Sequence, residues 1–211
     1  MDNWIKVTSI FLLSGLFLFG IYYSTAESDS KGPMQPILFS HKIHAGENQI
    51  PCEYCHSFAD VSTNPGIPSV QKCIGCHSQV HGKDEEYTTN DGQVINFKTE
   101  INKVKDYWER KEPIPWVKVT NMPDYVRFNH KRHIKRGFEC QTCHGEIQEM
   151  EVVKQFAPLT MGWSIDCHRT TNVSTQGNGY YDKLVEMHNK TSAEPMKVED
   201  IGGLECSKCH Y

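Results

Sequence analysis

The chain has 211 residues and a formal net charge of −4, so it has room for one or two small domains and no large catalytic scaffold. The weak acidity excludes an extended basic surface, and we expect no nucleic-acid partner. Apolar residues make up 38% of the chain, but many of them gather in the first 23 positions. Beyond this stretch only four leucines and five alanines remain, too few for an ordinary side-chain core.

Residues 4–23 form an apolar run in which Lys6 is the only charge. A helix of about 20 residues spans a bilayer core, and Trp4 and Tyr22 lie where interfacial aromatic residues belong. The pattern predicts one N-terminal transmembrane helix within residues 1–26. The chain would then be a single-pass protein of a bacterial inner membrane, with its bulk in the periplasm. A secretory signal cleaved near residues 24–26 is the alternative, and both place the remainder in an oxidising compartment.

Eight of the nine cysteines form four Cys-x-x-Cys pairs, and a histidine directly follows each pair. The pairs are Cys52–Cys55, Cys73–Cys76, Cys140–Cys143 and Cys206–Cys209, followed by His56, His77, His144 and His210. This is the attachment motif of c-type haem. The two thiols bond to the porphyrin vinyl groups, and the adjacent histidine then lies under the ring and binds the iron. We therefore expect four covalently bound haems here.

Zinc, disulfide bonds and redox-active dithiols are the alternative uses of paired cysteines. The 17 residues between Cys55 and Cys73 fit a zinc ribbon, but zinc does not require a histidine directly after the second cysteine. Disulfide bonds fit poorly with an odd number of cysteines. A redox dithiol normally accompanies a thioredoxin-like βαβ pattern, which the sequence does not show.

An internal repeat predicts a fifth haem. The segment Phe39–His44 (FSHKIH) recurs 89 residues later as Phe128–His133 (FNHKRH), and the first Cys-x-x-Cys-His motif recurs after 88 residues. Cys76 and His77 recur after 91 residues as Cys167 and His168, with Ser164 in place of the first cysteine. We predict that Cys167 holds a haem through one thioether and that His168 binds its iron. A vestigial site with a free thiol is the alternative.

Five porphyrins would supply the apolar area that the side chains lack. The expected fold is therefore mostly α and irregular, with c3/c7-like haem modules, a haem-filled core and little sheet. Its divisions would be an anchor (1–26), a dihaem module (27–82), a connecting segment (83–127) and a module with three haems (128–211). In the connecting segment, the sequence predicts a hairpin turn at 89–92, a helix from Thr99 through Arg110 and an extended stretch at 113–119. We expect this stretch, called the clip, to pack over haems or to contact a partner.

Six histidines remain for the opposite faces of the five irons. We expect four of them, in the two F-x-H-x-x-H segments, to be distal ligands, because their spacing of three directs them to different irons. These are His41, His44, His130 and His133. For the fifth iron we favour His188, on a predicted helix at 180–190. His81 is a reserve, and Met122, Met161 and Met187 are further candidates, although methionines more commonly serve packing.

Four basic residues surround His133, namely Lys131, Arg132, Lys135 and Arg136. We expect them to neutralise haem propionates; a docking patch for an acidic partner is the alternative. The sequence contains no catalytic triad, phosphate loop or paired-carboxylate pattern, so we expect no enzymatic activity from this chain on its own.

The F-x-H-x-x-H segment ahead of Cys-x-x-Cys-His resembles the cytochrome c3/c7 multihaem class. Three segments, MGWSIDCHRTTNV, QGNGYYDKL and IGGLECSKCHY, together with the apolar N-terminus, resemble a narrower family. That family is the membrane-anchored pentahaem cytochrome c subunit of alternative complex III, a bacterial quinol:cytochrome c oxidoreductase. Ser164 departs from the family pattern, which has a cysteine there.

The resemblance implies an electron-transfer subunit with five c-type haems in a membrane-bound respiratory complex. It would take electrons from an iron–sulfur subunit, beside quinol-binding membrane subunits, and pass them to a monohaem cytochrome c or a terminal oxidase. One alternative is the multihaem subunit of a periplasmic menaquinone reductase complex, in which electrons run the other way. A nitrite-reductase-type multihaem enzyme is a further alternative, and it requires one iron with an open face. The sequence leaves haem order and the direction of electron flow open.

Overall fold

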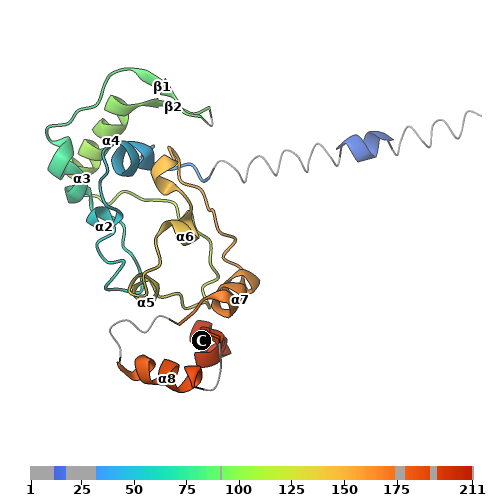
Figure 1. Ribbon diagram of the computed structural model, residues 1–211. Helices are drawn as coiled ribbons and strands as arrows, with labels where there is room; N and C mark the ends of the chain where they lie inside the picture. Colours follow the sequence, from blue (N-terminus) through green and yellow to red (C-terminus); the bar gives the residue numbers. More distant parts are fainter. Residues whose placement is uncertain (1–11, 18–31, 91, 174–178, 191–193, 211) are drawn as a thin grey trace, which may run out of the picture.

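The computed structural model describes residues 12–17, 32–90, 92–173, 179–190 and 194–210. Short helices joined by long loops dominate it, with one two-stranded hairpin (Figure 1), which confirms the mostly helical and irregular fold. The named elements in chain order are η1 (Lys42–Glu47), α2 (Cys52–Cys55), α3 (Val70–His77), β1 (Glu86–Thr88), β2 (Val94–Asn96), α4 (Phe97–Arg110), α5 (His130–Ile134), α6 (Gln141–His144), η2 (Ile147–Glu149), α7 (Met161–Thr170), α8 (Gly179–Asn189), η3 (Glu199–Ile201) and α9 (Cys206–Cys209).

The expected transmembrane anchor needs correction. Within the described ranges, none of the helices combines the length and the apolar character needed to cross a bilayer. Residues 12–17 of the predicted span are helical. This finding contradicts the expected single-pass localisation. The rest of the predicted span, residues 4–11 and 18–23, lies outside the described residues.

The helices that carry the cysteines are short. The motifs lie on α2, α3, α6 and α9, and the Ser164–Cys167 site lies on α7. Thr160 caps α7, because its hydroxyl accepts a hydrogen bond from the Trp163 amide at 3.3 Å. Such short helices bring the two cysteines of a motif close together, with the histidine at the end of the helix or directly after it, as covalent haem attachment requires.

The connecting segment contains the predicted hairpin and helix. Strands β1 and β2 are antiparallel, with Thr88 opposite Val94. Helix α4 ends at Arg110 as predicted, but it begins at Phe97 and its cap is Asn96, whose side chain accepts from the Thr99 amide at 3.0 Å. Thr99 therefore lies in the first turn of the helix and does not cap it. Residues 113–119 form neither helix nor strand, as predicted for the clip.

Glu151 ties the hairpin to η1. Its buried carboxylate, 8% exposed, accepts hydrogen bonds from Lys42 Nζ at 3.1 Å, Tyr87 Oη at 2.5 Å and the Asn90 amide at 2.9 Å. Burial alone raises the pKa of Glu151, but these bonds from Tyr87, Asn90 and Lys42 outweigh it and lower the pKa below its ordinary value. The residue thereby joins segments from both copies of the repeat.

Side chains form a small hydrophobic core at one end of the molecule. Its buried members are Ile37, Val104 and Ile114, and Trp116 packs against them with residues of α3. In the part of the chain that the structure describes, seven hydrophobic residues are buried, whereas many large ones are exposed, Phe58 and Ile67 among them. Haem faces can cover such apolar area, so this distribution agrees with the haem-filled interior expected from the composition.

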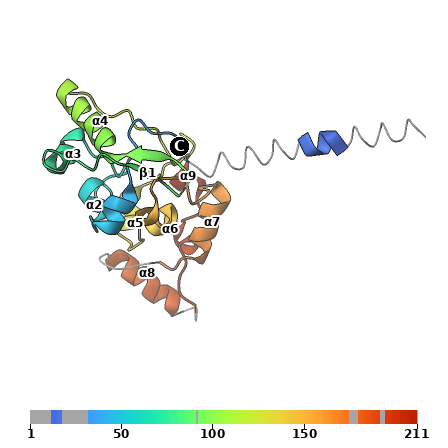
Figure 2. The same cartoon turned by 90° about the horizontal axis from the view of Figure 1, so that it is seen from above.

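The elements form an elongated arrangement. Helix α4 and the hairpin lie at one end, α8 lies at the other, and α2, α5 and α6 lie between them in two perpendicular views (Figures 1 and 2). The helices that carry the cysteine motifs are therefore distributed along the length of the molecule.

Candidate functional site

The two F-x-H-x-x-H segments have the same three-ring geometry. Phe39 stacks on His44 with ring centroids 4.3 Å apart and meets His41 edge-on at 4.8 Å. The second copy repeats this with Phe128, which stacks on His133 at 4.4 Å and meets His130 edge-on at 4.8 Å. One phenylalanine thus orients two histidines in each copy, and the repeat seen in the sequence is confirmed in three dimensions.

Three of the four expected distal histidines lie opposite a motif histidine. The ring centroids of His44 and His77 are 6.0 Å apart. Those of His130 and His144, and those of His133 and His168, are 6.4 Å apart in both cases. The first histidine of a segment therefore faces the nearer motif, and the second faces the later one.

These separations fit a metal ion between two imidazoles. Metal–imidazole bonds are about 2 Å long, so two bonds plus the distance from each ring centre to its Nε2 give about 6 Å. The angles between the ring planes are 64°, 8° and 21° in the three pairs. A ligating imidazole can rotate about its metal bond, so this spread is compatible with one kind of site.

Backbone carbonyls fix the tautomer of these histidines. A carbonyl oxygen can only accept, so a ring Nδ1 beside it must donate, and Nε2 is left with its lone pair for a metal. The contacts, at 2.8–3.1 Å, are His44 to Ser40, His56 to Gly66, His77 to Val80, His130 to Thr63, His133 to Asn129 and His168 to Gly203. In two of the facing pairs, His44 with His77 and His133 with His168, both rings have an Nδ1 that donates to a carbonyl and an Nε2 that is free to bind a metal.

His41 and His56 complete the set expected from the repeat. Burial, and to a smaller extent the neighbouring His56 and His44, lower the pKa of His41 to about 4. The Nδ1 atom of His41 is buried without a hydrogen-bond partner. A buried imidazole that stays neutral is suited to bind a metal through its lone pair. Burial likewise lowers the pKa of His44, His133 and His144.

All nine cysteines are free thiols in the structure. Among the described residues, no group of three or more His, Cys, Asp or Glu side chains gathers as it would around a zinc ion. Burial raises the pKa of the thiols of Cys55, Cys73 and Cys143, so they are uncharged at neutral pH. The thiols are nevertheless accessible enough for covalent attachment, since Cys52, Cys76 and Cys206 are exposed and the others are half-buried.

Ser164 occupies the same helical position as Cys73 of the first copy. The Cys73 thiol points toward the Ser69 carbonyl four residues earlier, at 3.8 Å, and the Ser164 hydroxyl donates to the Thr160 carbonyl four residues earlier, at 3.2 Å. The two sites therefore have the same local geometry. A porphyrin at the α7 site would find one thiol, Cys167, and one hydroxyl that is already hydrogen-bonded.

The last motif has a different neighbour. The ring centroid of Tyr125 lies 5.6 Å from that of His210. His188 is half-buried on α8, which matches the predicted helix. Lys105 Nζ donates to Nδ1 of His81 at 2.8 Å, so the lone pair of this ring is already used. Met161 and Met187 are largely exposed.

The sequence did not indicate the carbonyl groups that orient the rings. They belong to loop and helix-start residues of ordinary type, such as Ser40, Asn129 and Thr63. Gly66, with a φ of 76°, and Gly203 are the exceptions, and a glycine ahead of a motif was the available signal. The basic residues around His133 lie on or directly after α5, with Lys131, Arg132 and Lys135 exposed.

Comparison with known proteins agrees with this geometry. Residues 107–211 match the class III cytochrome c family. The menaquinone reductase multihaem cytochrome c subunit of Nitratidesulfovibrio vulgaris is 28% identical over 176 residues, which cover 83% of this chain and 67% of that protein.

Proposed function

We propose that the chain is a c3-type multihaem cytochrome that relays electrons as a subunit of a menaquinone reductase complex. The observation that carries this proposal is the similarity to the multihaem subunit of such a reductase over 83% of the chain. Neither comparison points to alternative complex III, which the sequence motifs had favoured. The partners would be the other subunits of the reductase and an electron donor.

Five covalent haems are part of the proposal. Each would have one proximal histidine from its motif, and four would have a distal histidine from the F-x-H-x-x-H segments. The pairs are His56 with His41, His77 with His44, His144 with His130, and His168 with His133. Their support is the ring separation of 6.0–6.4 Å in three pairs and the buried, neutral His41 beside His56 in the fourth. His210 would bind the fifth iron, with His188 as its distal candidate.

When bound, haem supplies reversible one-electron oxidation and reduction of its iron. The residues of the chain do the rest. Paired imidazoles close both faces of a site, so these four sites would leave no position for a substrate. Phe39 and Phe128 hold the imidazoles in place, and the backbone carbonyls keep Nε2 directed at the site. The arrangement of these four sites suits a relay with little rearrangement between redox states.

Purification of the intact complex through a tag on this chain would test the proposal. We expect the haem absorbance of the reduced complex to be reoxidised by a menaquinone analogue, and only when the partner subunits are present. Reduction of the haems by menaquinol, with rapid electron transfer to an oxidised monohaem cytochrome c, would instead support a quinol-oxidising complex and contradict the proposal.

A further inference from the structure

The first two motif helices lie next to each other. Burial raises the pKa of the Cys55 thiol on α2 and of the Cys73 thiol on α3. The two helices are close enough for Cys76 on α3 to raise the pKa of Cys55 further, and for Cys55 to raise that of Cys73. Lys72, next to Cys73, places its Nζ 4.4 Å from the ring centre of Tyr54 on α2. The Cys73–Cys76 site therefore borders the Cys52–Cys55 site.

The Cys52–Cys55 site also borders the second half of the chain. Burial, and then the neighbouring Cys52 side chain, raise the pKa of the Cys140 thiol, so these two side chains lie close together. His130 donates from its backbone amide and its ring to the Thr63 carbonyl, at 3.1 and 2.9 Å, and the Lys131 amide donates to the Ser62 carbonyl at 3.1 Å. A loop of the first copy thus holds α5, which supplies the distal histidine candidate of the Cys140–Cys143 site.

The third and fourth sites share α5. Its two histidines, His130 and His133, face His144 and His168 respectively, each at 6.4 Å. Cys143 on α6 and Cys167 on α7 are also electrostatic neighbours. The Cys140–Cys143 site therefore borders the Cys167 site.

The fourth site leads to the fifth. The ring of His168 donates to the Gly203 carbonyl at 2.8 Å, and Gly203 lies just ahead of α9. Lys197 Nζ, from the same C-terminal segment, donates to the Thr170 carbonyl at the end of α7, at 3.2 Å. The Arg127 amide donates to the Cys209 carbonyl at 2.7 Å, which holds α9 against the segment that leads into α5.

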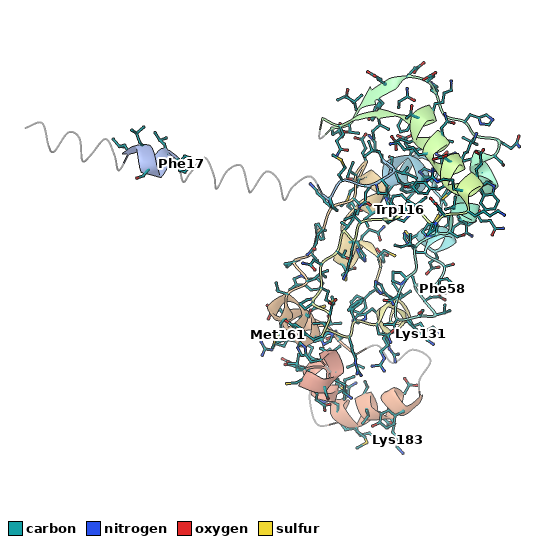
Figure 3. All side chains as sticks on the ribbon, turned by 180° about the vertical axis from the view of Figure 1, so that it is seen from behind. Phe17, Phe58, Trp116, Lys131, Met161 and Lys183 are labelled. Atoms are coloured by element: carbon teal, nitrogen blue, oxygen red, sulfur yellow. The ribbon has the colours of Figure 1, made fainter. Side chains whose placement is uncertain are left out.

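We infer that the five sites form one line in the order Cys73–Cys76, Cys52–Cys55, Cys140–Cys143, Cys167, Cys206–Cys209. The Cys73–Cys76 site, which is the second motif along the sequence, is thus at the start of the line. The ribbon follows this order from α3 through α2 and α6 to α7 and the C-terminal end (Figure 1), and the labelled side chains run the same way from Trp116 past Phe58 to Lys131 and Met161 (Figure 3). The inference rests on the proposed function only in that haem is present at the sites.

The order assigns the two ends of the relay. One end is the Cys73–Cys76 site, where α3 packs on the small side-chain core with Ile37 and Val104. The other end is the Cys206–Cys209 site near the C-terminus. A redox partner that exchanges electrons with the relay would dock beside one of these two sites, because the three inner sites each lie between two others.

Iron anomalous scattering from crystals of the haem-loaded, full-length chain tests the order directly. Each iron peak is identified by the histidine attached to it. The expected result is that the iron on His56 lies between those on His77 and His144, and that the iron on His168 lies between those on His144 and His210. An iron on His77 that is nearer to the iron on His144 than to that on His56 would overturn the order. The result does not depend on which complex the chain belongs to.

A matched pair of variants tests the order in solution. A distal methionine raises the potential of a haem, so the altered haem is reduced first, and its loss of paramagnetism changes the electron paramagnetic resonance of its neighbours. His41→Met alters the haem on His56, which has two neighbours in the proposed line, so the signals of two other haems should change in a partly reduced sample. His44→Met alters the haem on His77 at the end of the line, so the signal of one other haem should change. Equal numbers of altered signals in the two variants would overturn the order.

Discussion

The imidazole rings of His130 and His144 lie 6.4 Å apart, and their planes are within 8° of parallel. The two residues belong to different helices, α5 and α6, and are 14 positions apart in the sequence. The ring of His130 is held by the Thr63 carbonyl of the first copy of the repeat. A site of the second copy is therefore oriented by the first, and the two modules are structurally interdependent.

Replacing one distal histidine should raise the potential of one haem. In the His133→Met variant, we expect one of the five midpoint potentials to rise by roughly 0.1 V or more, within the range of about 0.8 V that axial ligands set. Spectroscopic redox titration measures this. His81→Met is the control, because His81 is exposed and bonded to Lys105, and it should leave all five potentials unchanged.

Cys167 and Ser164 should have opposite effects on haem attachment. Cys167→Ser should reduce the covalent haem count by one, since no second thiol is available on α7. Ser164→Cys should keep the count and add a second thioether, which moves the pyridine haemochrome band of that haem to the position of the others. An unchanged count in Cys167→Ser, measured by intact mass, would show that this site holds no covalent haem.

Phe128 should contribute to the stability of the chain and to the ligation of two haems. Phe128→Ala removes contacts with both His130 and His133, and aromatic pairs of this kind are worth about 0.5–1.5 kcal/mol each. We expect a loss of stability on the order of 1–3 kcal/mol and a high-spin fraction at two haems. Phe138→Ala is the comparison, since Phe138 contacts His133 from 6.3 Å and should affect one haem at most.

Glu151→Gln should lower stability at neutral pH and remove a pH dependence. The variant keeps the shape but weakens three hydrogen bonds to a buried carboxylate, a loss of about 1–3 kcal/mol. The pKa of Glu151 is lower in the folded chain, so its contribution is present above the unfolded value of about 4.5 and is lost as the pH falls through the folded value. Denaturant unfolding from pH 7 to 3 should show a smaller decline in the variant; an equal decline would contradict this role.

The sequence predicted the local features well because each depends on few residues. The Cys-x-x-Cys-His helices and the hairpin before α4 follow from spacing within a few positions. The stacking of Phe39 and Phe128 on the histidines was not predicted. The cap of α4 was assigned to Thr99 instead of Asn96, because both residue types cap helices and the strand end between them was not apparent. Which site borders which depends on contacts such as Cys52 with Cys140, which spacing along the chain cannot show.

We propose that paired histidines and thiols hold five haems in the interior of this chain. Intact mass of the purified, full-length protein, combined with pyridine haemochrome quantitation, is the decisive measurement. We predict five covalent haems per chain. A colourless protein with the mass of its amino acids alone would contradict the account.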